Sequence, residues 1–188
     1  MNDEISILLP VYKRNEFLHL FLMNVKSQTY NHNKLTLCID ECESDEPFIP
    51  NINFVKQVLD PIKVDHRVYK TRSGIGEKRN RLVKNAKTKY VQFFDSDLIH
   101  EATLFFDRKW FNTTNKFTRR NCGEGKRLFE GINEKYVSIS DVKNIMICLC
   151  HKDNTVNKDR FKVETSEHFL SDDIKEHLQN YCPFLFNS

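Results

Sequence analysis

Two aspartates, Asp95 and Asp97, stand directly after a short apolar run, Tyr90 to Phe94. An Asp-x-Asp sequence places two hard oxygen ligands within reach of one divalent cation, which takes its other ligands from water and phosphate. The run is aromatic and β-branched, so we expect a buried strand with both carboxylates at its carboxyl end. In open α/β sheets, ligands bind at that edge. Asp-Ser-Asp also occurs in plain turns, and its position after the strand is what favours a metal site.

A basic helix is predicted immediately before this strand. Gly74 and Gly76 lie in the loop that opens it, and Lys78, Arg79 and Arg81 lie on it. Arginine can bind a phosphate through two parallel hydrogen bonds. The apolar residues that recur at helical spacing, and therefore predict one buried stripe, are Ile75, Leu82, Val83 and Ala86. The glycines are not a dinucleotide-binding fingerprint, because no third glycine follows at the required spacing.

The chain before this unit alternates short apolar runs with helical patterns. Strands are predicted at Ile5–Val11, at Leu35–Ile39 (which ends in Asp40 and Glu41) and at Val64–Tyr69. Helices are predicted at 16–27, with Asn15 as N-cap, and at 54–59. This rhythm predicts a mostly parallel central sheet flanked by helices, with right-handed crossovers.

The second half of the chain is less periodic. We predict a helix over 101–110 with Leu104, Phe105 and Phe106 packed inward, and a polar, basic loop over 112–131. Strands at 136–140, 145–150 and 160–163 would form a small antiparallel β element. A last helix would begin after Ser171, where Asp172 and Asp173 suit the positive end of the helix dipole.

Composition indicates a folded domain outside the secretory route. The chain has 188 residues, 29% charged residues, a net charge of +3 and six cysteines with no CxxC pair. This length supports a single domain with its own core. No run of 18 apolar residues and no signal peptide are recognisable, so we expect a cytoplasmic protein with reduced thiols and no membrane span. A zinc site at Cys148, Cys150 and His151 is disfavoured because no second ligand pair follows.

The central unit resembles family 2 glycosyltransferases of the GT-A (Rossmann-like) fold. The resemblance rests on Gly74, on Arg79-Asn80, on the strand that follows and on Asp95-Ser96-Asp97, in that order. The first strand with its Pro-x-Tyr turn, Ser27 to Tyr30, and Leu37 to Glu41 add to it, so that it covers roughly residues 5–100. The Asn/Lys/Phe-rich composition and the compact length of the chain also resemble those of glycosyltransferases of large DNA viruses, which act in the host cytoplasm.

The resemblance implies a metal-dependent, inverting transfer of a sugar from a UDP-sugar to a hydroxyl of a glycan or glycoprotein. Asp97 would bind the cation, Mn²⁺ or alternatively Mg²⁺, while Asp95 would act through water or the ribose. Arg79 would contact the diphosphate with help from Lys78. The other residues expected at the nucleotide-sugar site are Pro10, Val11, Tyr12, Arg14, Asp40, Glu41, Gly74 and Ser96. Glu41 would accept the ring N–H of the base.

Asp173 would be the general base, with Asp172 beside it and Glu164 and Glu167 in reserve. The Gln-x-x-Arg-Trp signature of processive members is absent, which indicates one sugar per encounter. Residues 1–100 would form the nucleotide-sugar half and 101–188 the acceptor half of one domain, complete or cut from a longer protein.

Other functions stay open. A nucleic-acid-binding module is suggested by nine basic residues between Arg67 and Lys89, opposed only by Glu77. Charge runs are more often solvated helix faces, so we expect no nucleic-acid partner. A nucleotidyltransferase would show a glycine-rich signature after the first strand, where Pro10 to Arg14 stands instead. A sugar-binding module without turnover is the remaining alternative.

Overall fold

The computed structural model describes residues 3–94, 104–113 and 116–118, and the single residues 128, 130, 176, 179 and 180. The strands in these ranges are β1 (Ile5–Val11), β2 (Leu35–Cys42), β3 (Lys63–Tyr69), β4 (Tyr90–Phe93) and β5 (Phe105–Asp107). The α-helices are α1 (Leu18–Lys26), α2 (Ile52–Leu59), α3 (Ile75–Asn85) and α4 (Arg108–Thr113), and two short 3₁₀ helices cover Asn15–Phe17 and His32–Lys34.

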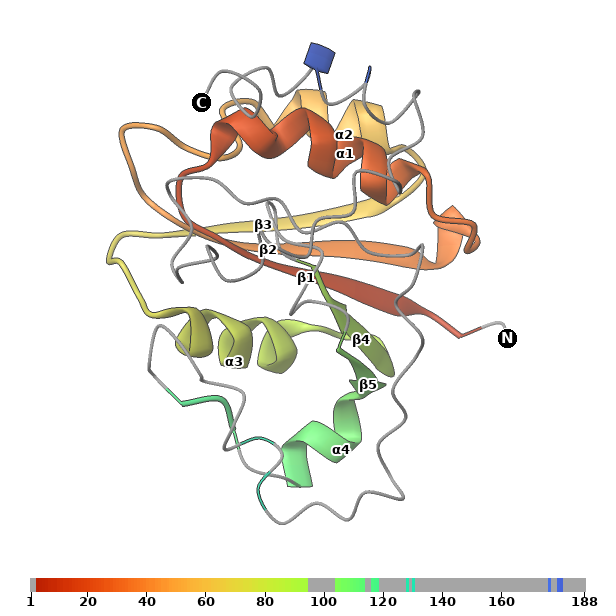
Figure 1. Ribbon diagram of the computed structural model, residues 1–188. Coiled ribbons are helices and arrows are strands. Elements are labelled where there is room, and N and C mark those ends of the chain that lie inside the picture. The colour runs from red at the N-terminus through yellow and green to blue at the C-terminus, as the bar shows by residue number, and fades with distance from the viewer. Residues whose placement is uncertain are drawn as a thin grey trace, which may run out of the picture.

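The strands form one sheet in the order β3-β2-β1-β4-β5 (Figure 1). β1 pairs in parallel with β2 and β4, and β2 pairs in parallel with β3. Only β5 runs antiparallel to its neighbour, with Val91 opposite Phe106. The predicted mostly parallel sheet is therefore confirmed, and an antiparallel element is present at the β4–β5 edge.

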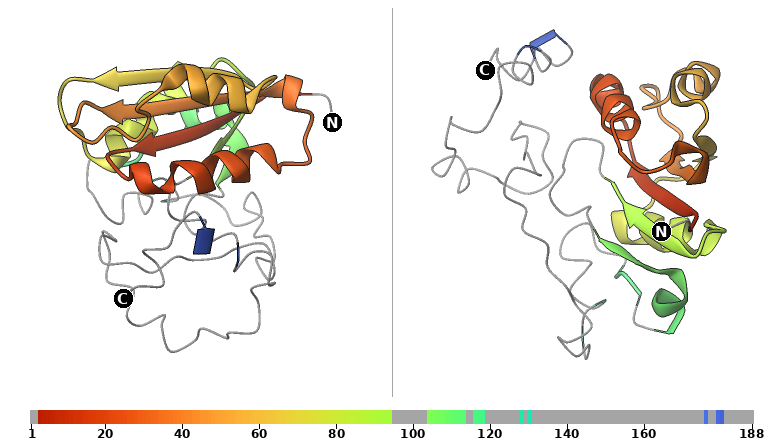
Figure 2. Two further views of the ribbon diagram at one scale, coloured as in Figure 1. Left: turned by 90° about the horizontal axis from the view of Figure 1, so that it is seen from above. Right: turned by 90° about the vertical axis from the view of Figure 1, so that its right-hand side faces the viewer.

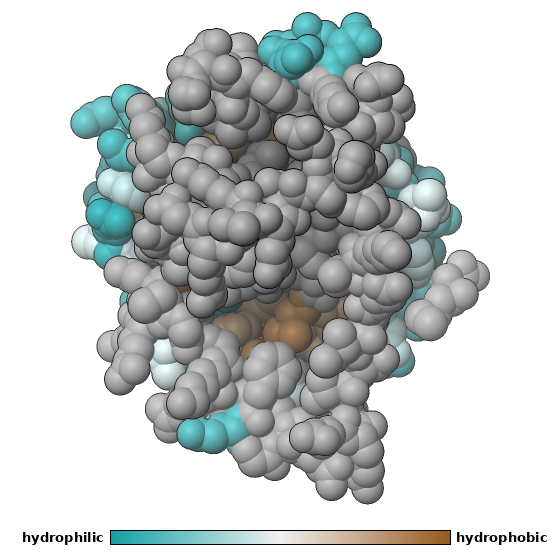
Figure 3. Space-filling model, in the orientation of Figure 1, coloured by the Kyte–Doolittle hydropathy of each residue, from teal (hydrophilic) through white to brown (hydrophobic). Residues whose placement is uncertain are grey.

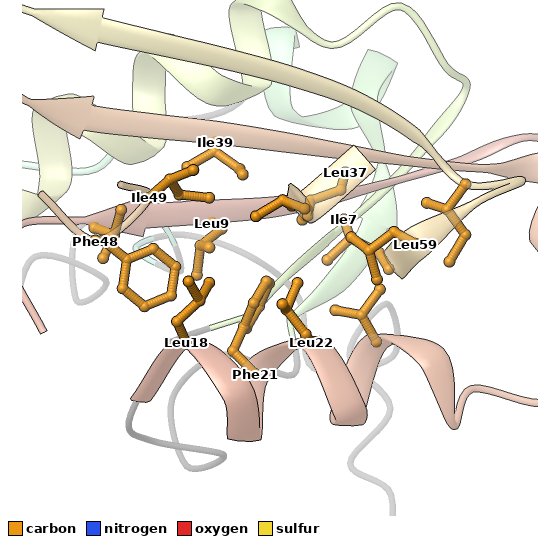
Figure 4. Close-up of a cluster of buried hydrophobic side chains, with 14 of the residues drawn as sticks. Ile7, Leu9, Leu18, Phe21, Leu22, Leu37, Ile39, Phe48, Ile49 and Leu59 are labelled. Carbon is orange, nitrogen blue, oxygen red and sulfur yellow. The ribbon is translucent and has the colours of Figure 1, made fainter. Parts of the chain in front are cut away.

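Helices cover both faces of the sheet. α1 and α2 lie side by side on one face, and α3 lies on the other with α4 beyond it (Figures 1 and 2). Side chains alternate between the faces along each strand. Ile7, Leu9, Leu37 and Ile39 point toward α1 and α2, where they pack with Phe21 and other buried residues (Figure 4). The opposite face buries Leu8, Cys38, Val91 and Phe93 against α3 and against Phe106, Phe111 and Phe117.

The predicted helix over 101–110 is wrong within the residues that the structure describes. Phe105 begins β5, and α4 begins only at Arg108. The aromatic residues here follow the period of a strand and not of a helix: Phe106 is buried, whereas Phe105 is 46% exposed and stacks on Tyr90 with ring centroids 5.5 Å apart. Pairing with β4 outweighs the local helical pattern.

The predicted helix cap at Asn15 is also wrong. Asn15 begins the first 3₁₀ helix, and neither this helix nor α1 has a side-chain cap. Lys13 and Arg14 precede it in the left-handed conformation, with φ of 59° and 69°. The predicted strands over 136–163 lie outside the described residues, as does the predicted start of the last helix at Ser171.

The surface seen in Figure 3 shows an apolar patch at the height of α3 and β4 and hydrophilic residues toward both sides. Among the residues with described positions, no helix has the length and apolar character needed to cross a membrane. Of the six cysteines, Cys38 and Cys42 lie in the described part, where both are buried free thiols. Burial raises the pKa of Cys38 to about 11, so this thiol stays protonated at neutral pH.

Shortening a buried side chain at the centre of the sheet should lower the free energy of unfolding by most of what that side chain's burial contributes. Leu37 on β2 is fully buried between β1 and β3, so Leu37→Ala should lower the free energy of unfolding by about 3 kcal/mol. Val68 on β3 is 55% exposed, and Val68→Ala should change it by less than about 0.5 kcal/mol. Urea unfolding of both variants measures the difference. Equal losses would contradict this packing.

Candidate active site

The carboxyl ends of β1, β2 and β3 meet the start of α3 at one edge of the sheet, on the left of Figure 1. β4 runs parallel to β1 and ends beside the middle of that strand, where the Phe94 N–H donates to the Leu8 carbonyl at 2.9 Å, so the chain after Phe94 continues in the direction of this edge. Pro10 and Val11 are the last two residues of β1, and they pair with Asp40 and Glu41, which come just before the last residue of β2. Gly74 is the N-cap of α3. Asp95, Ser96 and Asp97 follow Phe94 in the sequence but lie outside the described residues, as do Asp172 and Asp173.

Lys78 joins α3 to the end of β1. Its side chain is 2% exposed, and Nζ donates to the Val11 carbonyl and lies 5.6 Å from the centroid of the Tyr12 ring. Burial lowers the pKa of Lys78, while the neighbouring Cys42 and Asp40 oppose that shift. The Lys78 ammonium is thus bound to the protein's own backbone. Its predicted contact with a diphosphate stays a prediction.

Tyr12 and the turn after it form the rim of this edge. The Arg72 guanidinium lies 4.6 Å from the centroid of the half-buried Tyr12 ring. Cation–π contacts of this kind are favourable and still leave the in-plane N–H groups of arginine able to bind a ligand. Arg14, which was predicted to contact the nucleotide sugar, lies two residues further on, in the left-handed part of the turn. Cationic side chains thus gather beside an aromatic ring.

Asp40 is neutralised by Arg81, a pairing that the sequence did not reveal. Both carboxylate oxygens of Asp40, which is 2% exposed, accept from Arg81 Nε and Nη2 at 2.8 Å each. Arg81 also donates to Ser73 Oγ at 2.8 Å and lies over the Tyr69 ring at 4.1 Å. The hydrogen bonds to Asp40 raise the pKa of Arg81, so its guanidinium stays charged. This pair holds the loop before α3 against the end of β2.

Glu41 points to the opposite face of the sheet and is held by two other partners. Its Oε1 accepts from the Phe48 backbone N–H at 2.5 Å, and His66 Nε2 donates to Oε2 at 2.8 Å. The side chain is 1% exposed. Glu41 therefore fixes the segment after β2 and the neighbouring strand β3, and a contact with a nucleobase would need a further lone pair of the same carboxylate.

Arg79 lies between two aromatic rings. Its guanidinium carbon is 5.5 Å from the centroids of both Phe93 and Phe117. The next residue, Asn80, bonds the backbone of Phe117 twice: Nδ2 donates to its carbonyl at 2.9 Å, and Oδ1 accepts from its N–H at 3.1 Å. The predicted basic face of α3 is thus largely internal, because Lys78 and Arg79 are buried.

A divalent cation at this edge needs oxygens beyond those of the described residues. The residues whose positions are described contain no group of three or more His, Cys, Asp or Glu side chains suited to a metal ion. Asp40 and Glu41 are bound to Arg81 and His66. A cation would therefore depend on the Asp95 and Asp97 carboxylates, which come next in the sequence after β4.

The residues missed by sequence reasoning are partners of the predicted ones. A buried acid at the end of a strand needs a counter-charge, which was a signal for Arg81. His66 pairs in register with Ile39 and so shares the face of Glu41, but this follows only from the strand pairing. Nothing in the local sequence connects Asn80 with Phe117, which lies 37 positions away.

Comparison with known proteins identifies the family. The description of the matching family is Glycosyl transferase family 2, and the match covers residues 6–105, which is 100 of 188 residues. The chain belongs to glycosyltransferase family 2. The match includes the whole edge described above and the Asp95-Ser96-Asp97 sequence.

Two curated relatives are glycosyltransferases. Poly(ribitol-phosphate) beta-glucosyltransferase of Bacillus spizizenii is 30% identical over 146 residues, which are 74% of this chain and 21% of the relative. Processive diacylglycerol beta-glycosyltransferase of Mycoplasma genitalium is 33% identical over 104 residues, which are 52% of this chain and 28% of the relative. The chain therefore matches between about a fifth and three tenths of the length of these relatives.

Among solved structures, the chain is similar to the mannosyltransferase PcManGT from Pyrobaculum calidifontis in complex with GDP-Man and Mn²⁺. The TM-score is 0.49 at 17% identity, over 54% of this chain and 30% of that one.

The two arginine–aspartate pairs of this region provide a matched test. Arg81→Met leaves the Asp40 carboxylate buried without its partner and should lower the free energy of unfolding by about 3–5 kcal/mol. Arg67 pairs with Asp65 on the surface, with both side chains about 40% exposed, and Arg67→Met should cost less than about 1 kcal/mol. Guanidinium unfolding at neutral pH measures both. Similar losses would show that the Asp40–Arg81 pair is not a major constraint.

The lowered pKa of Lys78 predicts a pH dependence of stability. Below its ordinary pKa of 10.5 the unfolded chain holds this proton more tightly than the folded chain does, so stability should rise as the pH rises through this range. The free energy of unfolding of the wild type, minus that of Lys78→Met, should therefore increase between about pH 8 and about pH 10. A flat or falling difference would mean that burial does not destabilise the ammonium.

Proposed function

We propose that this chain is a metal-dependent, inverting, non-processive glycosyltransferase that moves a sugar from a UDP-sugar to a hydroxyl of a glycan or glycoprotein. One observation carries the proposal: in a family 2 domain, α3 brings the buried cation Arg79 against β4, and the sequence runs from β4 straight into Asp95-Ser96-Asp97. A buried cation, followed in the sequence by two carboxylates, suits a substrate with a charged diphosphate.

The leaving diphosphate gains negative charge as the glycosidic bond breaks. Arg79 would bind it through parallel N–H groups, since the flanking Phe93 and Phe117 rings stabilise the guanidinium charge without occupying hydrogen-bond donors in its plane. A divalent cation held by Asp97 and Asp95, Mn²⁺ or alternatively Mg²⁺, would supply further charge stabilisation on the same oxygens.

The nucleoside would lie against the ends of β1 and β2. Pro10, Val11 and Tyr12 would wall its pocket, with Arg72 on the Tyr12 ring and Arg14 in the turn beyond. Glu41 remains the predicted acceptor for the ring N–H of the base. Lys78 would act by fixing the Val11 carbonyl, and Gly74 and Ser96 complete the predicted set.

The acceptor hydroxyl must lose a proton as it attacks. Asp173, with Asp172 beside it, is the proposed general base on the side opposite the leaving group. One base and in-line attack invert the anomeric carbon. The names of both relatives specify beta-glycosyl transfer, and inversion of an alpha-linked sugar nucleotide gives that configuration.

The nucleic-acid alternative loses support from the burial of α3. Four of the nine basic residues between Arg67 and Lys89 are buried or bound to an aspartate: Lys78 and Arg79 are buried, Arg81 is bound to Asp40, and Arg67 pairs with Asp65. The cytoplasmic location, including a host cytoplasm for a viral member, and the division into a donor half and an acceptor half remain predictions.

Donor binding should depend on the metal and on Asp97. Calorimetric titration of UDP and UDP-sugars should show binding with Mn²⁺ that disappears without it and in Asp97→Ala. Asp65→Ala is the matched control, because that aspartate lies half-exposed on β3 and pairs with Arg67. Binding without metal, or undiminished in Asp97→Ala, would overturn the metal assignment. The absence of any nucleotide binding in the wild type would overturn the glycosyltransferase proposal.

Substitution of the proposed general base should reduce sugar transfer without changing donor binding. Asp173→Asn keeps the shape but cannot take a proton, so sugar transfer should fall by about 10²-fold or more while UDP affinity stays unchanged. Asp172→Asn is the neighbouring control and should keep most of the activity. Measured transfer to an acceptor sugar, with donor hydrolysis as a second readout, checks this. If Asp172→Asn loses the activity and Asp173→Asn keeps it, the roles are reversed.

A further inference from the structure

Phe117 is held in place by the Asn80 side chain, whose hydrogen bonds within the described part of the chain all go to the Phe117 backbone. The carboxamide of Asn80 accepts from the Phe117 N–H at 3.1 Å and donates to the Phe117 carbonyl at 2.9 Å. This reciprocal pair fixes the position of one residue as a neighbouring strand would. Phe117 belongs to the described segment 116–118, and it lies 37 positions after Asn80 in the sequence.

The hydrogen bonds from Asn80 hold the Phe117 ring next to two groups of the candidate site, the Phe93 ring and the Arg79 guanidinium. It lies edge-on to the Phe93 ring, at 90° and with centroids 5.5 Å apart, and its own centroid is 5.5 Å from the Arg79 guanidinium carbon. Phe93 lies at the same distance from that carbon. Two rings at right angles restrict a planar guanidinium far more than one ring does, so Phe117 limits the directions in which Arg79 can present its N–H groups.

We infer that Asn80 is a positioning residue for donor binding, which holds Phe117 against Arg79 and thereby orients the guanidinium toward the diphosphate. This inference rests on the proposed function, since it takes Arg79 as the diphosphate contact. Asn80 itself need not touch the substrate. Bidentate binding of a phosphate requires a fixed guanidinium plane, so loosening Phe117 should weaken donor binding even though the charge of Arg79 is kept.

The test uses two variants that break the same chain of contacts at different points. Asn80→Ala removes both bonds to the Phe117 backbone, and Phe117→Leu keeps an apolar side chain but removes the ring. Each should weaken UDP binding in the presence of Mn²⁺ by about tenfold, and the double variant should be no weaker than either, because both act through Arg79. Asn85→Ala is the matched control: Asn85 lies on the same helix, and among the residues that the structure describes its side chain donates only to the Tyr69 hydroxyl, at 3.5 Å.

A ligand-independent readout separates this role from a loss of folding. Protons near aromatic rings experience ring-current shifts, so the Nε–H signal of Arg79 in arginine-¹⁵N-labelled protein should move in Asn80→Ala and in Phe117→Leu. Arg79→Lys identifies that signal by its disappearance. Thermal unfolding confirms that each variant is folded at the temperature of measurement. Trp110, the single tryptophan, packs on Phe106 in the same aromatic cluster and reports by fluorescence whether the cluster as a whole is intact.

The outcomes are distinct. A shifted Arg79 signal together with weakened UDP binding supports the positioning role. An unchanged signal in Asn80→Ala, or a shifted signal with unchanged UDP affinity, overturns it while the proposed function stands. If the wild type binds no UDP at all, the proposed function fails and the positioning role in donor binding fails with it.

Discussion

The buried ion pair between Asp40 and Arg81 is the constraint on which the arrangement of this edge depends. A carboxylate with 2% exposure is stable in its charged form only beside a counter-charge, and Arg81 supplies it through two hydrogen bonds of 2.8 Å. Because Arg81 lies on α3, the pair fixes the rotation of that helix against β2. Lys78 and Arg79, three and two positions earlier, are thereby directed to Val11 and to Phe93. The positions of these cations follow from one interaction.

Most of the fold could be predicted from local patterns, because the elements of the first half carry their own periodicity. β1 matches its predicted range, and β3 and α2 extend the prediction by one and two residues. The prediction failed at Phe105, where pairing with Gln92 of β4, 13 positions earlier in the chain, decides the structure. A local pattern contains no information on such a partner.

The candidate site divides in the same way. The residue types at the ends of β1 and β2 and on α3 were predictable, because their order along the chain resembles that of family 2 glycosyltransferases. Their contacts were not. The sequence places Asp40 and Glu41 side by side, but strand geometry sends them to opposite faces, one to Arg81 and the other to His66 and Phe48. Only the folded sheet shows that Asp40 holds helix α3 in place, whereas Glu41 holds the loop at Phe48.

In the turn after β1, two charged residues adopt a backbone conformation that lowers the stability of the protein. Lys13 and Arg14 both adopt the left-handed conformation, which costs a residue with a Cβ atom roughly 1 kcal/mol and which glycine or asparagine adopts more easily. Two consecutive cations therefore occupy positions where smaller residues would make a more stable protein. A variant selected for thermal stability alone should lose these cations first, so that heat resistance and positive charge would evolve in opposite directions at this turn.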